Sequence, residues 1–141
     1  MSRSGMPFPV LCGKETAMNS LFDGRSNDLL KVRAWREHET LIVELAGEID
    51  LATTDLLRWA LRAAENLIIP PHPLVIDLRG VTFLNSSGLG QLIECARRCA
   101  VLAVSLRLVA DGNSVIRPIN LLGLAPMLPV YADMEDAVLA L

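Results

Sequence analysis

The run Leu74–Leu78 constrains the fold more than any other part of the chain. It reads Leu-Val-Ile-Asp-Leu and is nearly continuously apolar, the pattern of a β-strand that is covered on both faces. After a short polar stretch, residues 87–103 carry apolar side chains at spacings of three and four, as an amphipathic helix does. A buried strand followed by a long helix predicts an α/β fold with a mostly parallel sheet.

The rest of the chain repeats this alternation of strand and helix patterns. Two strands are expected at 30–36 and 41–47, and the polar residues 37–40 between them predict a β-hairpin. A helix that starts at Thr53 or Thr54 follows, because either hydroxyl is a suitable N-cap. The other expected elements are strands at 104–109 and 128–131 and helices at 113–123 and 133–141. The prediction is a mixed sheet of four to five strands, with the antiparallel hairpin at one edge, packed against about four helices.

Apolar spacing also predicts which face of each helix is buried. In the first helix the expected stripe faces away from Glu65 and consists of Leu56, Ala60, Ala63, Ala64 and Leu67. In the second helix it consists of Leu89, Leu92, Ile93, Ala96, Cys99, Ala100 and Ala103. Cys95 and Cys99 are expected as small buried groups, because two thiolates without further ligands make a poor zinc site. No metal site is predicted.

Composition and charge argue against several classes of protein. The chain has 141 residues, 52% hydrophobic and 21% charged, which suits one globular domain. A net charge of −3 without a basic patch argues against nucleic-acid binding. No apolar run approaches the ~20 residues of a membrane span, and no secretory core is found, so we expect a cytoplasmic protein. Residues 1–28 show no helical or strand period and are expected to form a flexible tail before a domain at 29–141.

The stretch Asn85–Gly90, Asn-Ser-Ser-Gly-Leu-Gly, joins the buried strand to the long helix. It falls at the carboxyl edge of the predicted sheet, where α/β proteins place their functional sites. Ser86 or Ser87 can cap the helix, and Gly88 and Gly90 leave room for another molecule to approach the backbone. The stretch is therefore either a plain capped helix start or a functional site.

Several functions can be weighed for these residues. A ligand phosphate would meet the positive end of the helix, although neither G-x-x-x-x-G-K-[ST] nor G-x-G-x-x-G is present. Phosphate can instead be added covalently to a serine. A nucleophilic serine would need G-x-S-x-G and a base, and the two histidines, His38 and His72, are expected in a turn and a proline-rich loop. Enzyme activity is therefore not expected.

Four segments together resemble the STAS domain (sulphate transporter and anti-sigma factor antagonist) over about residues 29–141. They are Gly47–Asp50, Val75–Leu78, Phe83–Gly90 and Gly123-Leu124, and they occur in the family's order and spacing. The resemblance implies a STAS-type fold. Free-standing STAS proteins are anti-sigma factor antagonists, which bind an anti-sigma factor, often a serine kinase with an ATP-binding fold, and so free a sigma factor.

The resemblance also implies which residues carry the function. The kinase phosphorylates the first serine of the family motif D-S-[ST]-G-L-G, which corresponds to Ser86, and the complex then dissociates. The residues implied in partner binding are Asp50, Asn85, Ser86, Ser87, Gly88, Leu89 and Gly90. Asn85 departs from the motif, since the family usually has Asp there. The amide keeps an acceptor oxygen but removes a negative charge beside the acceptor hydroxyl, which leaves phosphorylation open.

The sequence thus predicts a cytoplasmic anti-sigma factor antagonist, a monomer or weak dimer without cofactor or metal, that is switched off by phosphorylation at Ser86. The alternative is a STAS module that is never phosphorylated and acts as a nucleotide or anion sensor or as a signalling scaffold.

Overall fold

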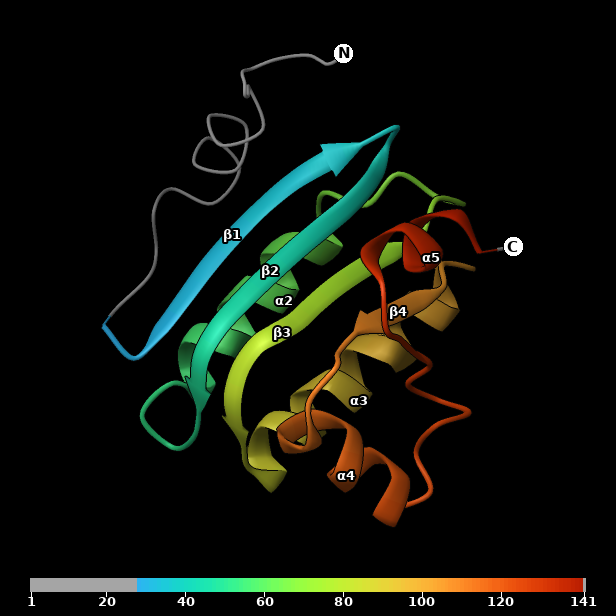
Figure 1. Ribbon diagram of the computed structural model, residues 1–141. Helices are drawn as coiled ribbons and strands as arrows, with labels where there is room; N and C mark the ends of the chain where they lie inside the picture. The colour runs from blue at the N-terminus through green and yellow to red at the C-terminus, as the bar shows by residue number, and fades with distance from the viewer. Residues whose placement is uncertain (1–27, 141) are drawn as a thin grey trace.

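A five-stranded mixed sheet organises residues 28–140, the part of the chain that this computed structural model describes (Figure 1). The strands are β1 (Leu30–Glu37), β2 (Thr40–Ile49), β3 (Leu74–Leu84), β4 (Leu106–Val109) and β5 (Val130–Tyr131). The helices are α2 (Thr54–Glu65), α3 (Ser86–Val101), α4 (Asn113–Leu121) and α5 (Met134–Leu139). The predicted α/β class and the predicted order of elements are confirmed.

β1 and β2 form the predicted antiparallel hairpin, but the turn between them is shorter than expected. Thr40 pairs with Glu37, so only His38 and Glu39 connect the strands. Both turn residues have positive φ angles, 51° and 71°, as a two-residue hairpin turn of type I′ requires. The last pair of the ladder, Glu37 and Thr40, is polar, and for this reason the sequence predicted both residues in the loop. β2 also extends to Ile49, beyond the expected end at residue 47.

The strands lie in the order β1-β2-β3-β4-β5, and from β2 onward each strand runs parallel to its neighbour. Helices α2, α3 and α4 cover one face of the sheet, and α5 covers part of the other (Figure 1). In β3, Leu74 and Ile76 point into the larger core under the three helices, whereas Val75 joins the smaller core with Ala137 of α5. β3 is therefore covered on both faces, as its sequence predicted.

The buried face of α2 differs from the expected stripe. Leu57 and Leu61 are fully buried, whereas Leu56 is only partly buried. Glu65 was expected on the solvated face, yet its side chain is only 9% exposed and pairs with Arg98 of α3, with 2.6 Å between Oε1 and Nε. Because α2 packs against α3 as well as against the sheet, the buried face of the helix is wider than the expected stripe and is rotated relative to it.

The two cysteines of α3 are small buried groups, as predicted. Cys95 and Cys99 are both 0% exposed, and neither is in a disulfide. A hydrogen bond with Cys99, together with burial, raises the pKa of the Cys95 thiol. Ala100 and Ala103 were expected on the buried stripe but are exposed, because the helix ends at Val101 and leaves the core there.

Two further predictions concern the chain as a whole. Within residues 28–140, none of the helices has both the length and the hydropathy that crossing a bilayer would require. The same residues contain no group of three or more His, Cys, Asp or Glu side chains placed to hold a metal ion. The predicted tail at 1–28 lies outside the described residues apart from Asp28, and so does Cys12.

Candidate functional site

β2 and β3 end side by side at one edge of the sheet. Ile49 is in register with Leu84, and the backbone N–H of Asn85 donates a hydrogen bond to the carbonyl oxygen of Ile49 at 3.0 Å. The residues that follow the two strands are therefore neighbours. This arrangement brings Asp50 to the same edge as Ser86, although 36 positions separate them in the sequence (86 − 50).

The helix after β3 is capped by Asn85, which corrects the expectation that Ser86 or Ser87 would be the cap. Asn85 has extended backbone angles (φ −86°, ψ 174°), and its Oδ1 accepts a hydrogen bond of 2.8 Å from the backbone N–H of Gly88. Asparagine is among the best N-cap residues. Because the amide satisfies this helix end, the two serine hydroxyls are not needed there.

Ser86 is the first residue of α3 and is exposed. Its hydroxyl forms no hydrogen bond with any residue of the described part of the chain. Ser87, the next residue, is half-buried. Of the two serines, Ser86 is thus the one whose oxygen is open to a second molecule, at the positive end of a helix dipole.

The two glycines of the stretch have different roles. Gly88 is buried, and a Cβ atom there would lie 2.3 Å from Ile49 Cγ2 and 3.0 Å from Leu84 Cδ1. Because Gly88 has no side chain, the first turn of α3 can approach the ends of β2 and β3. The space beside Gly88 is therefore filled by this protein's own residues and not by another molecule. At Gly90 a Cβ would meet nothing within 4 Å, and only this glycine leaves space for another molecule.

Leu89 belongs to the core. Its side chain is 4% exposed and packs in the larger core cluster. The side chains and backbone that a second molecule would meet at this edge are therefore those of Asp50, Asn85, Ser86, Ser87 and Gly90, with Gly88 and Leu89 beneath them.

Asp50 lies in a loop that is fixed by its own hydrogen bonds. The Asp50 carboxylate accepts from the backbone N–H of Ala52 at 2.9 Å. Thr53 precedes α2 but forms no side-chain cap, because its hydroxyl oxygen accepts instead from the backbone N–H of Asp50 at 2.9 Å, while its proton is donated to the carbonyl of Glu48 at 2.7 Å. These bonds hold Asp50 half-buried beside the Ser86 edge and leave Leu51 86% exposed at the tip of the loop.

The residues around this edge match a known family. Residues 31–137 match the profile of the STAS domain. The chain belongs to the STAS domain family. Among its relatives, the anti-sigma-F factor antagonist RsfA of Mycobacterium tuberculosis is 30% identical over 114 residues, which are 81% of this chain and 89% of RsfA. The antagonist RsfB of the same organism is 32% identical over 111 residues, 79% of this chain and 88% of RsfB.

A solved structure gives the same assignment. The crystal structure of an anti-sigma factor antagonist from Mycobacterium paratuberculosis superposes with a TM-score of 0.74 at 32% identity, covering 82% of this chain and 96% of that one. The STAS-type fold expected from the sequence is therefore confirmed.

The histidines of this STAS domain lie away from Ser86. His38 is in the β1–β2 turn, and His72 precedes β3 and pairs with Glu39 of that turn, with 2.9 Å between Nε2 and Oε1. This places both at the amino ends of β2 and β3, the opposite edge of the sheet. The predicted places of the two histidines, a turn and a loop, are confirmed, and neither side chain lies beside the Ser86 hydroxyl.

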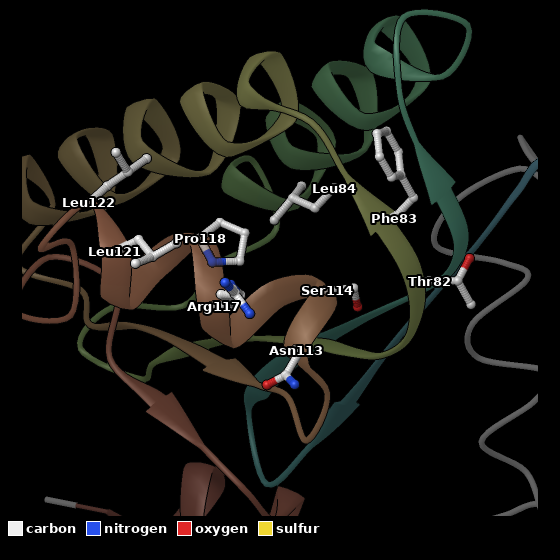
Figure 2. Close-up of a pocket in the computed structure, with 9 residues that line it drawn as sticks. All are labelled: Thr82, Phe83, Leu84, Asn113, Ser114, Arg117, Pro118, Leu121 and Leu122. Carbon is white, nitrogen blue, oxygen red and sulfur yellow. The ribbon is translucent and has the colours of Figure 1, made fainter.

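An apolar groove beside the site was not predicted. It has a volume of about 500 Å³ and lies between the end of β3 and α4 (Figure 2). Its lining residues are Thr82, Phe83, Leu84, Asn113, Ser114, Arg117, Pro118, Leu121 and Leu122. A bond of 2.8 Å from the Ser114 hydroxyl to the carbonyl of Val81 fixes α4 beside β3. The available signal was the sequence Leu121-Leu122, directly after the last buried turn of α4.

Proposed function

We propose that this STAS domain is an anti-sigma factor antagonist, which binds an anti-sigma factor in the cytoplasm and thereby frees a sigma factor for transcription. The names of RsfA, RsfB and the Mycobacterium paratuberculosis protein support this role. The observation that carries the proposal is the Ser86 hydroxyl, exposed and without a partner among the described residues, at the first position of α3.

The partner in this proposal is an anti-sigma factor with a kinase-type ATP-binding fold. It covers the edge formed by Asp50 and the stretch Asn85–Gly90 and transfers a phosphate from ATP to Ser86. The antagonist itself acts as a monomer or weak dimer and contributes no catalytic group.

The proposed switch follows from local electrostatics. A phosphoserine adds about −1.5 to −2 charges at neutral pH. At the start of α3 these charges face the positive end of the helix, so the fold tolerates them. At the centre of an interface they add bulk and charge that the partner's surface does not match. A loss of ~3 kcal/mol weakens binding more than 100-fold, which is enough to separate the complex without any refolding of the antagonist.

Asn85 is compatible with this switch. Its side chain serves as the helix cap, a role that Asp fills equally well. The neutral amide also places no carboxylate next to a phosphate on Ser86, which removes a like-charge repulsion. We therefore propose that Asn85 permits phosphorylation, and that its effect falls on recognition by the kinase.

The test uses the purified chain, anti-sigma factors from the source organism and ATP. Mass spectrometry of the digested chain is expected to find one phosphate, on Ser86, and none in the Ser86→Ala variant. Ser87→Ala is the matched control and should still be phosphorylated. Calorimetry should show tight binding of the unmodified chain and at least ~100-fold weaker binding once it is phosphorylated.

Other results would point elsewhere. Phosphate on a different residue, or equal affinity before and after modification, would refute the switch at Ser86. Tight binding of ATP or GTP by the chain alone, with no modification and no anti-sigma factor bound, would identify a nucleotide sensor instead.

A further inference from the structure

The groove between β3 and α4 brings together three large apolar side chains that are exposed to solvent. Leu121, Leu122 and Phe83 are large apolar residues that are 72%, 63% and 51% exposed, and all three line it. In Figure 2 the β3 residues form one side of the groove and the α4 residues the other. Contiguous exposed apolar surface of this kind marks an interaction site.

The groove is continuous with the proposed partner surface. Leu84 lines the groove, and Ser86 follows two residues later as the first residue of α3. Leu84 also packs close to Gly88, beneath the Ser86 edge, since a Cβ atom at Gly88 would lie 3.0 Å from Leu84 Cδ1. A protein that covers Ser86 therefore reaches the groove without crossing any other element.

Charge in the groove indicates what kind of side chains it accepts. Arg117 is its one charged lining residue, is exposed, and forms no ion pair with any of residues 28–140. Among residues 28–140, no carboxylate lines the groove. Apolar walls with one unpaired guanidinium at the rim are complementary to a large apolar side chain that has a carboxylate close to it.

Two other occupants fit less well. A nucleotide would need several charged or backbone donors for its phosphates. The groove supplies one guanidinium and the neutral side chains of Thr82 and Asn113, and the Ser114 hydroxyl already donates to Val81. A second copy of this chain, bound groove to groove across a two-fold axis, would present the same lining residues and so no carboxylate to pair with Arg117.

We infer that the groove binds a segment of the anti-sigma factor in which an apolar side chain, such as Leu, Met or Phe, fills the space against Leu121 and Phe83 and a neighbouring Asp or Glu pairs with Arg117. The inference rests on the proposed function and adds a second contact to it, independent of Ser86. Binding through the groove anchors the partner, and the Ser86 edge makes the complex sensitive to phosphorylation.

The experiment measures the affinity of the full chain for the purified anti-sigma factor found in the binding test above. Leu121→Asp is expected to weaken binding at least ~10-fold, and Arg117→Glu at least ~3-fold. Val101→Asp is the matched control, since Val101 is 86% exposed but ends α3 at the opposite edge of the sheet, and it should change affinity less than ~2-fold. Circular dichroism checks folding, and Leu122→Asp replaces any variant that unfolds.

The outcomes separate the two proposals. If the wild-type chain binds and all variants bind equally well, the groove inference is wrong while the proposed function stands. If the wild-type chain binds no anti-sigma factor, both are wrong. Sedimentation of the chain alone gives a further check. A dimer that Leu121→Asp dissociates would show that a second copy occupies the groove and would overturn the inference.

Discussion

The two glycines at the start of α3 give a prediction in which the same substitution has opposite effects two residues apart. Alanine favours a helix over glycine by about 1 kcal/mol. At Gly90 nothing lies within 4 Å of the added Cβ, so Gly90→Ala should stabilise the protein by about 0.5–1 kcal/mol.

At Gly88 the added methyl meets atoms that cannot give way easily. The nearest, Ile49 Cγ2 at 2.3 Å, belongs to a fully buried side chain, and as the branch methyl of a β-branched residue it moves only with χ1 or the backbone. Overpacking costs about 1–3 kcal/mol, and a contact of 2.3 Å places this substitution at the upper end, about 2–3 kcal/mol, which exceeds the gain of about 1 kcal/mol in helix propensity. Gly88→Ala should therefore destabilise the protein by about 1–2 kcal/mol net.

Urea denaturation of the wild-type chain and the two variants measures this difference. The two variants should differ by about 1.5–3 kcal/mol, so with a slope of about 1.5 kcal/mol per M their midpoints should lie about 1–2 M apart. A Gly88→Ala midpoint at or above wild type would refute the packing described for the first turn of α3. As a second check, replacing Ile49 with Ala removes Cγ2 and should reduce the cost of Gly88→Ala by about 1 kcal/mol in a double-mutant cycle.

Three further predictions concern the capping residue, the bridge between helices and the buried thiols. Asn85→Ala should lower the free energy of unfolding by about 1 kcal/mol, whereas Asn85→Asp should raise it by a few tenths, both measured by urea denaturation; equal stability of the two variants would refute the cap. Arg98→Ala should cost about 1–3 kcal/mol because it leaves the mostly buried Glu65 carboxylate with only the longer contact to Arg62, at 3.5 Å, whereas Arg97→Ala, which removes an exposed pair, should cost less than ~1 kcal/mol. Cys95 and Cys99 should resist a thiol reagent at neutral pH in the native protein and react in guanidinium, as peptide mass spectrometry can show; rapid labelling of the native state would contradict their burial.

The sequence predicts strands and helices well here because its patterns are local. Leu74–Leu78 is apolar throughout and cannot be solvated on either face, so its place inside the sheet follows directly. The edge at Ser86 follows just as directly, since the helix pattern begins where the strand ends. Strands and helices that depend on the pattern of one segment are therefore predictable from the sequence alone.

Apart from local errors at the N-cap and in the hairpin turn, the errors arise where two distant segments meet. Glu65 looks solvated within its own helix, but the approach of Arg98 from α3 adds a close ion pair that makes its burial favourable. In the sequence, Gly88 suggests room for another molecule to approach the backbone. In the fold, Ile49 of β2 fills that space. The groove of Leu121 and Phe83 joins elements 38 positions apart (121 − 83), which no periodicity reveals.

The strand order of the sheet has a consequence for the kind of molecule that this protein can hold. In α/β sheets whose strand order reverses, helices diverge to opposite faces and open a crevice in which a nucleotide or another small molecule is enclosed. Across residues 28–140 the order β1-β2-β3-β4-β5 never turns back, so α2, α3 and α4 stay together on one side and no crevice of that type forms. The edge at Ser86 is therefore an open surface of the sheet and not the mouth of such a crevice.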